Sequence, residues 1–429
     1  MWRRTILALL SLAVIAPAQQ FNHIVILVQE NRTPDNLFGW NPNFEPGVDI
    51  QTWGMSKTKR IDLQPIPLTE CFDLPHSHHT FVSQYAKGAM NGFDVKPILG
   101  KDGCVPPPYP EYLYVDNSDG TIQPYFDIAT GGGWANRFFQ TNQGPSYPAH
   151  QFLISGTSAI ADSSDVLVRE NPFEGSRAAG CEAPVGSWVW TIDSTGASGK
   201  VYPCFTRDSL FNTLDAANLS WIYYSPNSQV TWNAPQSLEQ YYQSPNNVLK
   251  PKQILTDIAS CNLANVVWVI PSSYFSDHPG GSSTGPQWIA SIMNAVFTNP
   301  TCPNGDEYWQ DTAVLVTWDD WGGWFDHVVP PPTGSSCPAV YCTGFRVPLL
   351  VASAYTPPGY VSNTTLDFGS ILRFVEENFS LPCLDSGEWA DCTSPGLAEF
   401  FMGSKAKPRL IKSKPFPMDT DDTGDPDTD

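Results

Sequence analysis

Charge is scarce in this 429-residue sequence, and positive charge is the scarcer of the two signs. Charged residues make up 15% of the chain and hydrophobic residues 41%, a balance that argues against disorder in the body of the chain. The 23 Lys and Arg residues stand against 43 Asp and Glu residues, which gives a formal net charge of -20. A chain this acidic is not expected to bind nucleic acid, nor to be drawn as a whole to anionic membranes.

Long apolar runs and closely spaced cysteines are missing as well. After the N-terminal segment, no run is long and apolar enough to span a bilayer, so we expect no stable membrane anchor. No two cysteines have C-x-x-C spacing, which argues against a zinc knuckle. The sequence shows no internal repeat, and its length suits one large α/β domain as well as two smaller domains.

The N-terminus predicts export. Arg3 and Arg4 precede the apolar run TILALLSLAVIA, and the polar break PAQQ follows, with cleavage expected near Ala18 or Gln19. A membrane anchor is the alternative, but the apolar run is short for a span. We therefore expect residues 1–19 to be a signal peptide and the mature protein to be secreted or periplasmic.

Ten cysteines follow the predicted signal peptide, and an even number in an exported chain suggests disulfides. Their spacing favours local pairs, although the sequence does not fix the connectivity. The expected pairs are Cys71–Cys104, Cys181–Cys204, Cys261–Cys302, Cys337–Cys342 and Cys383–Cys392.

Several apolar, β-rich runs predict buried strands, and near-continuous apolar character is typical of strands covered on both faces. These strands are expected at residues 23–28, 219–225, 265–270, 312–318 and 347–353. Patterns with helical period lie between them, at residues 209–219, 285–299 and 369–379. The alternation predicts an α/β fold with a central, mostly parallel sheet flanked by helices, and with long loop insertions. We expect one main domain at residues 20–400 and an acidic, disordered tail at 401–429.

Polar residues follow three of the predicted strands. Glu30 and Asn31 end the first, "SDHPGG" with His278 follows the third, and Asp319 and Asp320 end the fourth. Ligands of open α/β sheets bind beyond the carboxyl ends of strands, so these side chains are expected to converge. Each also has a plainer interpretation. The first pair can cap a helix, the His278 segment can be a turn, and the aspartates can be a solvated strand end.

Adjacent carboxylates beside an apolar strand repel each other unless something compensates their charge. The oxygens of Glu30, Asn31, Asp319 and Asp320 are hard ligands that suit one divalent metal ion, so a cation or a proton is expected between the aspartates. The Gly322–Gly323 pair would let the backbone turn sharply beside such a site.

The segment "FQTNQGPSYPAHQFLISGTSA" presents Ser146 in a Gly-Pro turn as a candidate nucleophile. It has no G-x-S-x-G elbow, so the usual mark of an α/β-hydrolase esterase is missing there. A serine in such a turn is by itself more often a turn residue. Among the few histidines, His76, His78 and His79 are clustered, and imidazoles near a cation would suit an anionic substrate such as a phosphate.

Together these motifs resemble the bacterial phosphoesterase family, which includes non-haemolytic phospholipases C and related acid phosphatases. The resemblance covers five segments in the same order over about residues 21–380: "HIVILVQENRTPDNLFG", the Ser146 segment, "SDHPGG", "VTWDDWGGWFDHVVPPP" and the closing "GFRVPLLVASAYTPPGYV" with "DFGSILRFVEENF". It implies an alkaline-phosphatase-like fold and phosphoester hydrolysis. The implied roles are metal ligands Glu30, Asn31, Asp319 and Ser146, nucleophile Ser146, catalytic His76, His278 and Asp320, and substrate contacts His76, His278 and His327.

The chain departs from the family pattern at Asp320, where the family usually has Glu, and at Thr33–Pro34, where it has Ser-Phe. The shorter Asp320 puts its role as ligand or base in question. The expected substrate is a small phosphoester or a phospholipid headgroup, and we favour a soluble phosphatase or phosphodiesterase over a dedicated phospholipase C. An inactive, metal-stabilised extracellular binding protein is the alternative of another class.

Overall fold

The computed structural model describes residues 20–95, 99–100, 104–172, 179–226, 231–298, 302–303, 307–331, 341, 343–384 and 389–416. The predicted signal peptide and the expected pair Cys337–Cys342 lie outside the described residues. Within the described ranges, no helix has the length and apolarity that a bilayer crossing requires.

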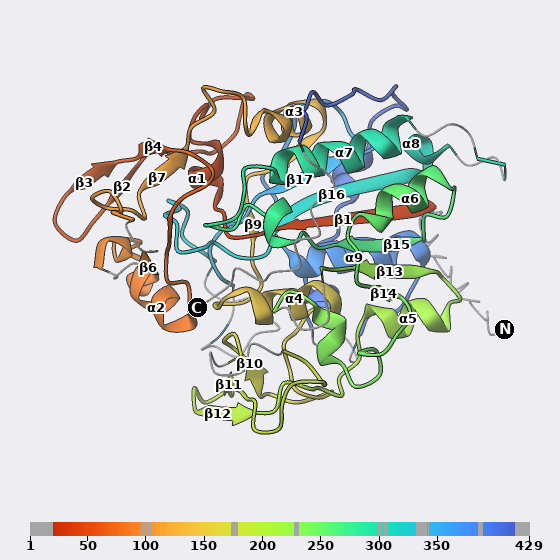
Figure 1. The fold of residues 1–429 in the computed structure, drawn as a ribbon, viewed down its shortest axis with the longest axis horizontal. Coiled ribbons are helices and arrows are strands. Elements are labelled where there is room, and N and C mark those ends of the chain that lie inside the picture. The colour runs from red at the N-terminus through yellow and green to blue at the C-terminus, as the bar shows by residue number, and fades with distance from the viewer. Residues whose placement is uncertain are drawn as a thin grey trace, which may run out of the picture.

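An eight-stranded sheet forms the centre of the molecule, in the order β14-β13-β15-β1-β16-β17-β8-β18 (Figure 1). Strand β1 (His23–Gln29) lies in its middle and pairs in parallel with β15 (Val266–Val269) and β16 (Thr312–Trp318). Strand β17 (Leu349–Ala352) runs antiparallel to β16 and to β8 (Gly133–Ala135). The remaining strands of this sheet are β13 (Trp221–Tyr224), β14 (Asn247–Val248) and β18 (Tyr360–Ser362). The mostly parallel α/β sheet predicted from the sequence is therefore confirmed.

Helices cover both faces of this sheet (Figure 1). Helices α3 (Gln123–Gly131), α6 (Gln253–Ala259) and α7 (Gly285–Thr298) pack together on one face. Helices α4 (Ser146–Ser155) and α9 (Phe368–Phe379) pack together on the other, beside α5 (Leu210–Ala216). Every residue of β1 and of β16 is buried, as a strand covered on both faces requires.

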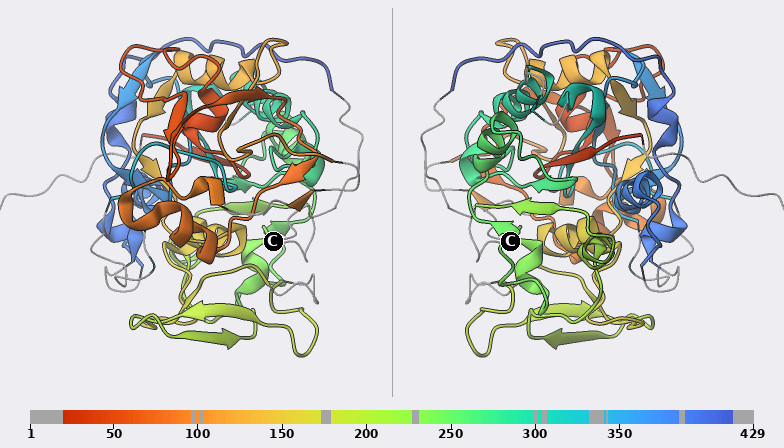
Figure 2. Two further views of the ribbon diagram at one scale, coloured as in Figure 1. Left: turned by 90° about the vertical axis from the view of Figure 1, so that its left-hand side faces the viewer. Right: turned by 90° about the vertical axis from the view of Figure 1, so that its right-hand side faces the viewer.

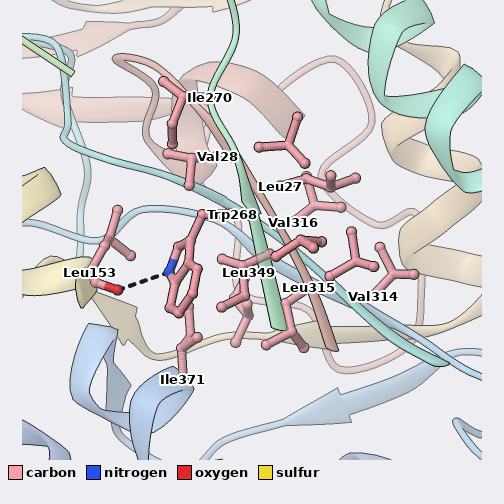
Figure 3. Close-up of a cluster of buried hydrophobic side chains, with 14 of the residues drawn as sticks. Leu27, Val28, Leu153, Trp268, Ile270, Val314, Leu315, Val316, Leu349 and Ile371 are labelled. Atoms are coloured by element: carbon pink, nitrogen blue, oxygen red, sulfur yellow. Dashed lines mark hydrogen bonds between the residues drawn. The ribbon is translucent and has the colours of Figure 1, made fainter. Parts of the chain in front are cut away.

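The core beneath α4 shows how the helix is held in place. The Trp268 side chain of β15 is buried, and its indole Nε1–H donates to the carbonyl oxygen of Leu153 in α4 at 3.1 Å (Figure 3). Leu27, Leu315 and the α9 residue Ile371 lie in the same buried cluster. Indole hydrogen bonding and apolar packing together fix α4, which carries Ser146, against the sheet.

The insertion between β1 and β8 forms small elements that lie beyond the end of β1, on the left of Figure 1. They are α1 (Pro34–Phe38), α2 (His78–Tyr85), β2 (Trp53–Met55), β3 (Arg60–Asp62), β4 (Gln64–Ile66), β5 (Phe72–Asp73), β6 (Leu99–Gly100) and β7 (Leu113–Val115). A separate three-stranded sheet projects from the body (Figure 2) and consists of β10 (Leu167–Val168), β11 (Val189–Ile192) and β12 (Ser198–Val201). Short elements complete the described chain: α8 (Tyr308–Asp311), α10 (Ala390–Thr393), β9 (Phe138–Phe139) and β19 (Leu366–Asp367).

Four of the five expected disulfides are confirmed. They are Cys71–Cys104, Cys181–Cys204, Cys261–Cys302 and Cys383–Cys392. The first part of the predicted tail lies on the body, where the Ile411 side chain is buried and its backbone N–H donates to Asn294 of α7 at 2.9 Å. The acidic end of that tail, residues 417–429, falls outside the described residues.

Candidate active site

The exits of β1 and β16 lie directly side by side, because the two parallel strands pair along their whole length up to Gln29 and Trp318. The backbone N–H of Asn31 donates to Asp319 Oδ1 at 3.1 Å, and that of Arg32 donates to the Asp320 carbonyl at 3.1 Å. The backbone then turns sharply. Asn31 has a φ of 61°, and Gly322 has a φ of 57° with the Asn31 carbonyl so near that an added Cβ would lie 2.5 Å from it.

One group of side chains at these exits, here called the strand-end cluster, consists of Glu30, Asn31, Asp319 and His150. His150 Nε2 lies 3.2 Å from Glu30 Oε1 and 3.7 Å from Asp319 Oδ2. All four residues are fully buried. Asn31 Oδ1 and Asp319 Oδ2 accept no hydrogen bond from any residue that the structure describes. Burying an oxygen without a hydrogen-bond donor costs free energy, and for a charged carboxylate the cost is several kcal/mol unless a cation or a donor compensates it.

His150 does not supply the missing positive charge. Burial lowers the pKa of His150 to about 4, although the charge of Asp319 acts in the opposite direction. The imidazole is therefore neutral at neutral pH. Two carboxyl groups, an amide oxygen and a neutral imidazole form a donor set that fits a divalent cation, and the predicted ligands Glu30, Asn31 and Asp319 all belong to it.

A second group, the serine cluster, contains Ser146, Asp320 and His76. The Ser146 hydroxyl donates to Asp320 Oδ2 at 3.2 Å, and His76 Nε2 lies 3.8 Å from the same carboxylate oxygen. His76 Nε2 also lies 3.4 Å from Asn31 Nδ2, which links the serine cluster to the strand-end cluster. All three members are fully buried. The two adjacent aspartates thus have different side-chain neighbours in the described chain: Ser146 and His76 beside Asp320, and His150 beside Asp319.

The helix α4 sets the position of the serine. Ser146 is its first residue and follows Pro145, whose backbone is extended. His150 lies four residues further on, so the two side chains project from the same face of the helix. The hydroxyl expected to bind the metal as well as the substrate therefore lies beside the strand-end cluster, with Asp320 as its hydrogen-bond acceptor.

The structure distinguishes the three clustered histidines. The Nδ1 atom of His76 lies 2.8 Å from the Leu74 carbonyl, and since a carbonyl only accepts, Nδ1 carries the proton and Nε2 faces Asp320. His78 instead bonds the Gln143 carbonyl at 2.7 Å, and burial lowers its pKa to about 4. His79 is exposed on α2.

His278 approaches the serine cluster from the loop after β15. Its ring centroid lies 6.3 Å from that of His76, and its Nε2 lies 3.8 Å from Asp73 Oδ2. The preceding Asp277 holds this loop, because its carboxylate accepts from Tyr125 at 2.7 Å and from Trp318 at 3.0 Å. Burial raises the pKa of Asp277 to about 6.

His327, predicted as a substrate contact, belongs to a different group, here called the arginine-bound cluster. Its Nδ1 lies 2.7 Å from Asp35 Oδ2, and its Nε2 lies 3.1 Å from Asp49 Oδ1. Arg346 binds both carboxylate oxygens of Asp326, at 2.8 and 2.9 Å, and lies 3.3 Å from Asp35. Asp35, and not the adjacent Asp326, contacts the His327 ring. The hydrogen bonds and ion pairs of His327 among the described residues do not reach the serine cluster.

Two further outcomes concern the strand exits. The alternative in which Glu30 and Asn31 cap a helix is wrong, because Thr33 is the N-cap of α1 and accepts from the Asn36 N–H at 3.2 Å. His150 was missed by the sequence analysis, although its spacing of four residues from Ser146 was a signal that could have pointed to it.

Comparisons with known proteins show the family of this chain. The sequence profile of the phosphoesterase family matches residues 21–382. Phospholipase C B of Mycobacterium tuberculosis is 24% identical over 88% of this chain and 77% of that protein. The non-hemolytic phospholipase C of Pseudomonas aeruginosa is 24% identical over 92% of this chain and 58% of that protein. Among solved structures, a Vibrio parahaemolyticus protein of the alkaline phosphatase superfamily is similar with a TM-score of 0.35 and 10% identity, over 84% of this chain and 67% of that chain.

Proposed function

This chain belongs to the phosphoesterase family and is a phosphoric ester hydrolase, and we propose that it works through Ser146 as a nucleophile beside a divalent metal site. The observation that carries the proposal is the hydrogen bond from the Ser146 hydroxyl to Asp320 Oδ2, with His76 Nε2 at 3.8 Å from the same oxygen. A hydroxyl is a weak nucleophile until a base takes its proton, and here the base is already in contact.

The proposed reaction has two halves. In the first, Ser146 Oγ bonds to phosphorus, its proton passes to Asp320, and the bond from phosphorus to the leaving oxygen breaks. His278 or His76, as an imidazolium with a proton on Nε2, protonates the leaving oxygen. In the second half, water attacks phosphorus and gives a proton to the same histidine. The bond from phosphorus to Ser146 Oγ breaks, Ser146 regains its proton from Asp320, and phosphate or a phosphate monoester is released. At 3.2 Å from the hydroxyl, Asp320 reaches the serine although its side chain is shorter than the usual Glu.

The strand-end cluster fits the metal that this chemistry uses. Asn31 Oδ1 and Asp319 Oδ2 are buried oxygens without a hydrogen-bond donor in the described chain, and Glu30 lies beside them. A bound divalent ion would stabilise negative charge on the phosphoryl group as a Lewis acid. The contribution of the protein is to hold these carboxylates in place through the β1 and β16 exits.

We propose a phosphodiester of the phospholipid-headgroup type as the substrate, because the named relatives that match most of this chain are phospholipases C. A phosphatase acting on monoesters is the second candidate, since the serine cluster itself does not distinguish the two. We further propose that residues 20–400 form the catalytic domain and that the protein is exported. The four disulfides support export, because such bonds persist in oxidising compartments.

The test is release of p-nitrophenol from p-nitrophenyl phosphorylcholine and from p-nitrophenyl phosphate, with and without chelator. Ser146→Ala is expected to lower turnover at least about 1,000-fold with the fold intact. Ser155→Ala is a matched control, because Ser155 is a buried serine at the other end of α4, and it should keep turnover. Wild-type turnover in the alanine variant at position 146 would overturn the covalent mechanism. Faster turnover of the monoester would favour the second candidate.

A further inference from the structure

We infer that His150 is a nitrogen ligand of the proposed metal ion, and that the site therefore takes a transition metal such as Zn²⁺ instead of Mg²⁺ or Ca²⁺. The inference rests on the metal site of the proposed function. It adds a ligand from α4 to a set that otherwise consists of oxygens from the ends of β1 and β16.

The first argument is distance. Two atoms that bind the same ion at about 2.1 Å can lie at most about 4.2 Å apart. His150 Nε2 lies 3.2 Å from Glu30 Oε1 and 3.7 Å from Asp319 Oδ2, so an ion bound to His150 is within reach of either carboxylate. The three ligand atoms lie within 4.8 Å of one another. The three side chains are fully buried, which removes bulk water as the alternative partner.

The second argument concerns where the imidazole proton lies. His150 Nδ1 faces the Tyr223 hydroxyl at 3.4 Å, and that hydroxyl donates its own proton to the Trp232 carbonyl at 2.8 Å. The tyrosine oxygen is therefore left as an acceptor for an N–H at His150 Nδ1. The neutral ring has only one such N–H, so Nε2 then points a lone pair at the Glu30 carboxylate.

Two lone pairs at 3.2 Å need a proton or a metal ion between them. The opposite tautomer would direct its N–H at Glu30 but leave Nδ1 facing a hydroxyl that has no proton to give. A metal ion at Nε2 satisfies both sides of the ring at once. This is the usual arrangement of a metal-binding histidine, whose second nitrogen donates a hydrogen bond to a neighbouring acceptor that fixes the tautomer.

The ligand type then determines the class of metal. Mg²⁺ and Ca²⁺ prefer oxygen ligands alone, while imidazole nitrogen suits Zn²⁺, Fe²⁺ and related ions. A set of two carboxylates, one amide oxygen and one imidazole belongs to the second class. An all-oxygen set at the strand exits, as expected from the sequence, would have favoured the first.

The experiment measures bound metal directly and needs no turnover. Full-length protein is stripped of metal and loaded with Mn²⁺, and electron spin echo spectroscopy then detects any directly bonded nitrogen. We expect nitrogen coupling in the wild type and in His76→Gln, and its loss in His150→Gln. Calorimetry should show Zn²⁺ affinity reduced by about 10- to 100-fold or more in His150→Gln, with Mg²⁺ affinity unchanged. The exposed His79→Gln variant is the matched control and should resemble the wild type.

Bound Mn²⁺ without nitrogen coupling in the wild type would overturn the ligand role, and so would coupling that persists in His150→Gln. If His150→Gln does not fold, the His76→Gln variant decides the question. Nitrogen coupling that is retained in His76→Gln supports His150 as its source. Nitrogen coupling that is lost in His76→Gln assigns the bound nitrogen to His76 and overturns the inference. Loss of turnover with chelator, together with absent nitrogen coupling, would sink this inference alone and leave the proposed function standing. A wild type that binds no divalent metal would overturn both.

Discussion

Two buried groups in this protein have nearly the same composition and very different surroundings. The strand-end cluster includes Glu30, Asp319 and His150, and the arginine-bound cluster includes Asp35, Asp326 and His327. Each therefore contains two carboxyl groups and one imidazole, whose three ligand atoms lie within 4.8 Å of one another. By composition alone, both are candidate metal sites.

Their electrostatic partners separate them. Arg346 binds Asp326 through two hydrogen bonds, at 2.8 and 2.9 Å, and lies 3.3 Å from Asp35, so the arginine-bound cluster contains its own cation. In the described chain, no Lys or Arg forms an ion pair with Asp319, and one of its oxygens accepts no hydrogen bond. A buried charge needs a partner. The arginine-bound cluster has a positively charged partner within the protein, Arg346, whereas the strand-end cluster requires a cation from outside.

The largest expected effect is on metal binding at Asp319. Asp319→Asn keeps the shape of the side chain but removes one charge, so we expect metal affinity to fall at least about 100-fold, with turnover partly recovered by excess metal. Asp326→Asn makes the same chemical change in the arginine-bound cluster and should keep full metal content. Elemental analysis and melting temperature are measured on both variants. Full metal content with full turnover in Asp319→Asn would remove the distinction between the two clusters.

The next effect is on stability and belongs to the other cluster. Arg346→Met leaves Asp35 and Asp326 buried without their cation, so we expect the free energy of unfolding to fall by about 3–5 kcal/mol. Metal affinity of the folded variant should not change. Chemical denaturation gives the first quantity and calorimetry the second. Adding Asp326→Asn to this variant removes one stranded charge and should restore part of the stability, whereas a further loss would contradict the charge-compensation argument.

The sequence predicted well those parts of the site that depend on strands. Near-continuous apolar runs fixed β1 and β16, and parallel pairing brings the residues after them together, so Glu30 and Asp319 were expected to meet. The resemblance to a known family implied that Ser146 is the nucleophile and that His76 is a catalytic residue of the same site. The structure adds the contact of each with Asp320.

The parts that depend on long-range packing were not predictable. His327 was expected to contact the substrate, but its partner is the distant Asp35, and the adjacent Asp326 binds Arg346. His150 shares a helix face with Ser146, yet only the packing of α4 on the sheet brings that face to Glu30. Adjacency in sequence carries little information about partners that come from other elements.

The smallest expected effect is the pH dependence of stability that His327 contributes in the arginine-bound cluster. Burial lowers the pKa of His327, but the hydrogen bond and charge of Asp35 and the charge of Asp326 outweigh it, so the pKa is raised above the ordinary value of 6.5. A raised pKa means that the folded state holds the proton more tightly. The stabilisation is therefore complete below about pH 6.5 and is lost as pH rises through the folded pKa.

The measurement compares the melting temperatures of wild type and His327→Gln between about pH 5.5 and pH 9. The His327 side chain is 17% exposed, so its protonated form is expected to add about 1 kcal/mol to the free energy of unfolding. For a protein of this size, this corresponds to about 2 °C in melting temperature. The wild type should melt higher by this amount at the acidic end and lose the advantage at the alkaline end. Other buried groups such as Glu111 titrate in the same interval, but they are present in both proteins and cancel in the difference. An advantage that stays constant, or grows with pH, would mean that His327 is held as a neutral ring and that Arg346 alone compensates the two aspartates.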